Sequence, residues 1–112
     1  ALGEALTLAK KAGLDLADVQ EVLDVADFRT PIYSGVGRGA QAGDYTVNFA
    51  LNLMLKDAKL IQAFAHRMGT PVPTAATAQK YIEESIKDGN GALNASALIL
   101  AIAKEGGVDL AQ

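Results

Sequence analysis

The sequence contains no cysteine and no tryptophan, and only 5% of its residues are aromatic. Without cysteine the chain has neither disulfide bonds nor thiol chemistry, and we expect a cytoplasmic protein. His66 is the single histidine, so we expect no metal centre and no catalytic role for this side chain. No apolar run approaches the roughly 20 residues of a membrane span, and we expect no membrane partner.

Basic residues are also few, with ten Lys and Arg against 13 Asp and Glu and a net charge of −3. They are scattered along the chain and form no basic stripe, so we expect no nucleic-acid partner. Half of the 112 residues are hydrophobic and 21% are charged. This composition is typical of one folded domain, and we expect residues 1–112 to form a single helical domain.

Apolar residues recur with helical spacing, and no segment alternates with the period of a strand. Asp15 and Asn94 are expected to cap helices, Pro73 suits a first helical turn, and glycines end several segments. The pattern predicts an all-α fold, a compact bundle of about five or six helices. The expected helices span residues 2–12, 16–26, 47–68, 73–88 and 95–105.

Residues 27–45 contain Pro31 and four glycines, and we expect this region to be the least regular part of the chain. A short helical piece around Ile32–Val36 is the only element we expect there. The run "GVGRGAQAG" invites comparison with a dinucleotide-binding loop. Its spacing is Gly-x-Gly-x-Gly, and the preceding segment is too short for a central strand, so the prediction is a flexible loop.

The segment "NFALNLMLKDAKL", residues 48–60, belongs to the longest expected helix. Apolar stripes cover more than half of its circumference, and we expect it to be the most buried helix. A narrow polar strip runs along one side of this helix. The strip consists of Asn48, Asn52, Lys56 and Lys59.

Asp57 falls outside that strip and within the apolar stripe of Leu53, Leu60 and Phe64. A carboxylate buried there costs several kcal/mol unless it is hydrogen-bonded or paired. One interpretation is a buried acid that accepts N–H groups from a neighbouring loop, and the pattern alone favours it. The other is that the helix lines a cleft, in which Lys56 offers a cation to an anionic ligand.

The string from "NFALNLMLKDAKLIQAFAHRMGTPVP" to "GNGALNASAL" resembles the C-terminal helical domain of the β-hydroxyacid dehydrogenases. This family includes 3-hydroxyisobutyrate dehydrogenase and tartronate semialdehyde reductase. The most specific part is the Phe-x-x-x-Leu-x-x-Lys-Asp pattern, which begins at Phe49 and ends in Lys56-Asp57. The opening "ALGEALTLAKKAGLD" resembles the first helix of the same domain. The resemblance covers nearly the whole chain.

The resemblance implies the C-terminal domain of a two-domain NAD- or NADP-dependent dehydrogenase of 3-hydroxy acids or their semialdehydes. Its implied partners are a small hydroxy acid, its own N-terminal Rossmann domain and further copies in a homo-oligomer. Lys56 would help to bind the cofactor, while Phe49 and Asp57 would belong to the substrate pocket. No catalytic residue is implied within the chain, because the family's catalytic lysine lies in a motif expected upstream of Ala1.

Two features qualify this interpretation. The family's Asp-x-Ser-Ala signature reads Asn94-Ala95-Ser96-Ala97 here, which leaves any role of that carboxylate open. The chain is helical from its first residues with no capping side chain before them, so we expect a fragment of a larger protein that is inactive alone. The alternative is a free-standing helical oligomerisation or ligand-binding module without redox activity.

Overall fold

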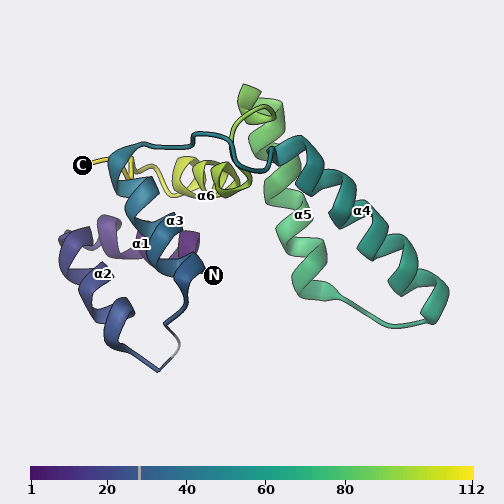
Figure 1. Ribbon diagram of the computed structural model, residues 1–112, viewed down its shortest axis with the longest axis horizontal. Helices are drawn as coiled ribbons and strands as arrows, with labels where there is room; N and C mark the ends of the chain where they lie inside the picture. Colours follow the sequence, from purple (N-terminus) through teal and green to yellow (C-terminus); the bar gives the residue numbers. More distant parts are fainter. Residues whose placement is uncertain (28) are drawn as a thin grey trace. The chain divides into compact units, whose positions relative to one another are not determined.

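The computed structural model describes residues 1–27 and 29–112, and its regular elements are helical (Figure 1). The α-helices are α1 (Leu2–Lys11), α2 (Leu16–Val25), α3 (Pro31–Ala42), α4 (Leu51–Met68), α5 (Pro73–Ser85) and α6 (Leu98–Glu105). A π-helical turn at Ile86–Asn90 and a 3-10 turn at Ala95–Ala97 complete them. The prediction of an all-α fold with about five or six helices is confirmed.

The chain divides into two compact units. The first contains Ala1–Tyr45 and Ile102–Gln112, and the second contains Thr46–Ala101. Helix α6 begins in the second unit and ends in the first. Among the described residues, no helix is both long enough and apolar enough to cross a bilayer.

Helices α1, α2 and α3 pack against one another in the first unit. Helix α1 ends as predicted before Gly13, whose φ of 81° suits a residue without a side chain. Asp15 caps α2 as predicted, because its carboxylate accepts the N–H of Ala17 at 2.8 Å. Leu6 and Leu16 are fully buried, so the apolar sides of α1 and α2 supply the core.

Helix α3 contains the short helical piece expected around Ile32–Val36, and it continues through the glycine-rich run that was expected to be a flexible loop, so the loop prediction was wrong. Its ends have the chemistry of a regular helix: Thr30 accepts the N–H of Tyr33, Pro31 stands in the first turn, and Gly43 follows with a φ of 65°. The internal glycines permit close packing. A Cβ built at Gly37 would lie 1.8 Å from Oε1 of Gln20, so α2 fills the space that a larger residue would need.

We expect Gly37→Ala to destabilise the protein by about 1–3 kcal/mol, because the new methyl group overlaps a buried side chain. Gln20 is only 3% exposed and donates to Asp24, so it has little room to move away. Gly35→Ala is the matched control in the same helix, since a Cβ there meets nothing within 4 Å. It should stabilise α3 by about 0.5–1 kcal/mol. Urea unfolding of both variants measures the difference, and equal midpoints would contradict the packing described.

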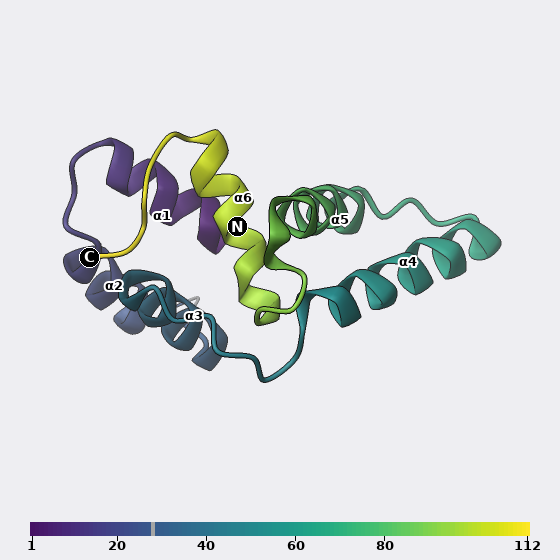
Figure 2. The same cartoon turned by 90° about the horizontal axis from the view of Figure 1, so that it is seen from above.

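In the second unit α4 and α5 run in opposite directions and pack against each other (Figures 1 and 2). Gly69 ends α4 with a φ of 65°, and Pro73 stands in the first turn of α5, both as predicted. The expected start of the long helix at Val47 was wrong by four residues. Asn48 to Ala50 precede α4, and an antiparallel bridge joins Ala50 to Asn94.

Helix α4 is not the most buried helix, contrary to the prediction. Only Leu51, Ala58 and Ala65 are buried along its length. Its packing partners are α5 and the two short turns that follow α5, which cover one face. The other faces carry apolar side chains that are half exposed or more within the chain: Leu60 62%, Ile61 52%, Phe64 56% and Met68 58%.

Candidate functional site

The three residues singled out by the sequence lie at and near the start of α4. Phe49 belongs to the segment that leads into the helix and is 40% exposed. Lys56 and Asp57 lie in its second turn, with side chains that are 60% and 49% exposed. All three side chains therefore present accessible surface in this chain.

The Lys56 ammonium lies 3.2 Å from Oδ1 of Asp57. This half-exposed ion pair overturns the interpretation of Asp57 as a buried acid held by backbone N–H groups. The face of α4 that carries Asp57 is open in this chain, so its charge stays partly hydrated. A solvent-exposed ion pair contributes only about 0–1 kcal/mol, which leaves the lysine able to exchange its partner for another anion or acceptor.

Lys56 also lines an open hollow of about 430 Å³ on α4. Its lining consists of Asn52, Leu55, Lys56, Lys59 and Leu60. The predicted polar strip is thus confirmed for its helical members, which are exposed. The ammonium groups of Lys56 and Lys59 and the amide of Asn52 can donate hydrogen bonds to an anionic or carbonyl group. Leu55 and Leu60 add apolar surface to the same hollow.

The backbone around Phe49 is fixed by the segment before α6. The N–H groups of Asn48 and Phe49 both donate to Oδ1 of Asn94, at 3.0 and 3.2 Å. The N–H of Ala95 donates to the carbonyl oxygen of Phe49 at 2.7 Å. Asn94 stands at the N-cap position as predicted, but its side chain makes no capping bond to the turn that it precedes.

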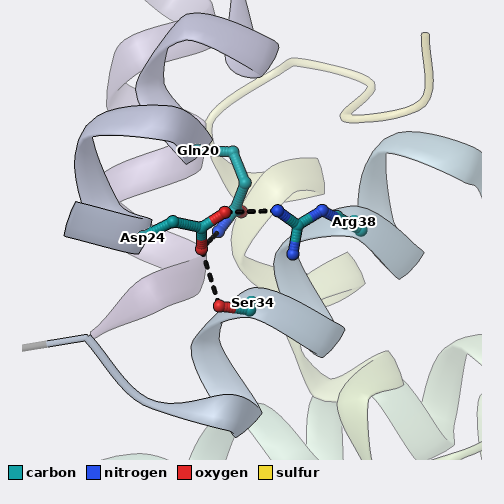
Figure 3. A network of polar contacts seen from close by, with 4 residues as sticks. All are labelled: Gln20, Asp24, Ser34 and Arg38. Carbon is teal, nitrogen blue, oxygen red and sulfur yellow. Dashed lines mark hydrogen bonds and ion pairs between the residues drawn. The ribbon is translucent and has the colours of Figure 1, made fainter.

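A polar network that was not predicted from the sequence joins α2 and α3 (Figure 3). The Asp24 carboxylate accepts the Ser34 hydroxyl at 2.6 Å and the Gln20 amide at 3.0 Å, and it pairs with the Arg38 guanidinium. Hydrogen bonds from Ser34 and then Gln20, with the charge of Arg38, lower the pKa of Asp24. This network explains how a glycine-rich segment stays helical, because its polar side chains are tied to α2.

The remaining candidate, His66, is exposed in the last turn of α4. In the part of the chain that the structure describes, no three residues of the types His, Cys, Asp and Glu gather into a possible metal site. Lys56, Asp57 and Phe49 are the residues that the sequence predicts for the site, and the structure places them at and near the start of α4.

Nearly the whole helical chain, including the exposed Lys56–Asp57 pair, matches one family of known proteins. Residues 1–111 match the family described as "NAD-binding of NADP-dependent 3-hydroxyisobutyrate dehydrogenase". The chain belongs to this family, which confirms the resemblance drawn from the sequence.

Among its relatives, glyoxylate/succinic semialdehyde reductase 1 of Arabidopsis thaliana is 30% identical over 91% of this chain and 35% of its own length. Cytokine-like nuclear factor N-PAC of Anopheles gambiae is also 30% identical, over 87% of this chain and 17% of its own length. The crystal structure of 3-hydroxyisobutyrate dehydrogenase from Salmonella typhimurium superposes with a TM-score of 0.83 at 29% identity. That comparison covers 89% of this chain and 35% of the crystallised one. The chain thus spans about a third of the plant reductase and of the crystallised dehydrogenase.

Proposed function

We propose that this chain is the helical, site-closing domain of an NAD- or NADP-dependent dehydrogenase of small 3-hydroxy acids or their semialdehydes. Its family and the names of its relatives support an oxidoreductase that uses a nicotinamide cofactor. In this proposal a Rossmann domain outside the chain holds most of the cofactor. The observation that carries the proposal is the exposed Lys56 beside an open hollow, within the helix that bears the family's Lys-Asp pattern.

The residues present fit the nicotinamide end of such a cofactor. Lys56 offers an exposed ammonium donor, and Leu55 and Leu60 provide apolar surface in the same hollow. A bound cofactor would provide the nicotinamide ring that exchanges the hydride with the hydroxy acid or its semialdehyde. Lys56 then donates a hydrogen bond to the cofactor, and Asp57 orients the ammonium group through their 3.2 Å contact. Phe49 lines the pocket for the hydroxy acid, whose hydroxyl proton passes to a lysine outside this chain.

We call the two-domain dehydrogenase proposed above, in which this chain is joined to its Rossmann domain, the longer protein. In the longer protein we expect Lys56→Ala to raise the dissociation constant for NADH or NADPH about ten-fold. A hydrogen bond to a charged group contributes about 1.5–3 kcal/mol, and 1.4 kcal/mol corresponds to ten-fold in affinity. Fluorescence titration of the reduced cofactor measures the change.

Lys59→Ala is the matched control, because it removes the same charge from the same hollow but not from the Lys-Asp pair. It should change cofactor affinity by less than about two-fold. Unchanged binding by Lys56→Ala, or an equal loss in both variants, would reject the assignment of Lys56.

Assembly into a homo-oligomer is a second role that we propose for this domain. The half-exposed residues Leu60, Ile61, Phe64 and Met68 all lie in the C-terminal half of α4. An apolar group of this kind is typical of a surface that packs against another protein. A module without redox activity remains the rival proposal, supported by a relative whose name, cytokine-like nuclear factor, is not that of an oxidoreductase.

A further inference from the structure

Asn94 uses both ends of its amide group within the second unit. Its Oδ1 accepts the N–H groups of Asn48 and Phe49, at 3.0 and 3.2 Å. Its Nδ2 donates to Oγ of Ser96 at 2.9 Å. Because the backbone N–H groups of Asn48 and Phe49 can only donate, the end of the amide that faces the segment leading into α4 is the acceptor oxygen.

This contact holds a segment that has little local support. Helix α4 begins after Ala50, which provides no side-chain cap. The first N–H groups of the helix instead reach the loop before Asn94: Leu51 donates to the carbonyl of Leu93, and Asn52 donates to that of Gly91. The start of α4 is therefore defined by residues about forty positions later in the chain, and Asn94 extends this connection back to Phe49.

We propose that Asn94 is a positioning residue for the substrate pocket, acting through the backbone of Phe49. The inference rests on the proposed function, in which the Phe49 ring lines that pocket. Two hydrogen bonds to consecutive N–H groups set the direction of the backbone at Phe49 and thus the place of its ring. A displacement of a positioning group by about an ångström is enough to weaken substrate binding substantially.

A double-mutant cycle in the longer protein tests whether Asn94 acts through Phe49. Asn94→Ala alone should raise the KM for the hydroxy acid about ten-fold and leave the cofactor dissociation constant unchanged. In a Phe49→Ala background the same change should add less than about two-fold to KM, because the ring it positions is gone. Additive effects on KM, or a rise in the cofactor dissociation constant, would overturn the inference.

Two further variants separate positioning from a general loss of folding. Asn94→Asp keeps the oxygen that accepts both N–H groups, and the Ser96 hydroxyl can turn to donate to it. This variant should return KM to within about two-fold of the original. Ser96→Ala removes only the partner of Nδ2 and should likewise leave KM nearly unchanged. A KM for Asn94→Asp as high as that of Asn94→Ala would contradict the assignment.

Hydrogen exchange in the 112-residue chain tests the contact independently of any redox activity. Asn94→Ala should speed exchange of the Asn48 and Phe49 amide protons about ten-fold or more, while protons in the middle of α5 keep their rates. Unchanged exchange at Phe49 would overturn the inference whatever the enzyme does. Faster exchange at Phe49, with no hydride transfer by the longer protein, would instead overturn the proposed function and leave the structural contact standing.

Discussion

The 112-residue chain alone is expected to transfer no hydride between a nicotinamide cofactor and any 3-hydroxy acid, in either direction. Hydride transfer requires a cofactor held against the substrate carbon and an acid/base group within hydrogen-bond reach of the hydroxyl. The candidate site offers an exposed lysine, a half-exposed acid and one aromatic ring, all at or near the start of α4. We assign these residues to binding, and the acid/base lysine to a segment outside this chain.

A spectrophotometric assay of cofactor oxidation and reduction measures this directly. The longer protein is the positive control and should turn over at least one small 3-hydroxy acid under the same conditions. Turnover by the 112 residues alone would show that the chain contains its own acid/base group, and it would contradict the division of roles proposed here.

Phe64→Glu should convert the proposed oligomer into monomers. Phe64 is 56% exposed, and its neighbours Leu60, Ile61 and Met68 are exposed to a similar extent. If this group packs against another copy, a carboxylate at position 64 enters an apolar interface, and the Arg67 guanidinium, 5.6 Å from the centre of the Phe64 ring, offsets only part of its charge. Burial of such a charge costs several kcal/mol, which raises the dissociation constant of the assembly by about a hundred-fold or more. Sedimentation velocity of the longer protein measures its mass in solution.

Ala63→Glu is the matched control for this experiment. Residue 63 is exposed and lies one turn beyond Lys59, in line with the polar strip of Lys56 and Lys59. The substitution adds the same charge to the same turn of α4 but on its polar side, so the mass should not change. A monomeric original protein, or equal dissociation in both variants, would show that the apolar residues of α4 do not form the interface.

Several helix ends were predictable because they depend on residues close together in the chain. Asp15 caps α2, Gly69 ends α4 in the left-handed region, and Pro73 opens α5. In each case the residue at the helix end is of a type that commonly begins or ends helices. The sequence motif likewise identified the family over nearly the whole chain.

The full length of helix α3 was not predicted, because glycine occurs both in flexible loops and in helices that pack closely against a neighbour. A run of glycines usually indicates a loop, since glycine loses the most conformational freedom in a helix. Here Gly37 gives room to Gln20 of α2, and Thr30 and Gly43 provide regular helix ends. Only knowledge of the packed neighbour distinguishes a flexible glycine from one that allows close contact.

The predicted burial of Asp57 and the predicted capping bond of the Asn94 side chain were wrong for a related reason. An apolar stripe predicts burial only if another element covers it, and the stripe beside Asp57 is left exposed in this chain. The Asn94 oxygen was assigned to the nearest helix end, whereas it binds N–H groups 46 and 45 residues earlier. Contacts at that separation leave no local pattern in one sequence.

The roles proposed for Lys56, Asp57 and Phe49 are best tested by a crystal structure of the longer protein with a nicotinamide cofactor and a 3-hydroxy acid bound. We expect the Lys56 ammonium to lie within hydrogen-bond distance of the nicotinamide end of the cofactor, with Phe49 and Asp57 beside the hydroxy acid. A structure in which the start of α4 faces away from both ligands would exclude these roles. Lys56 would then belong to an ordinary exposed surface of the domain.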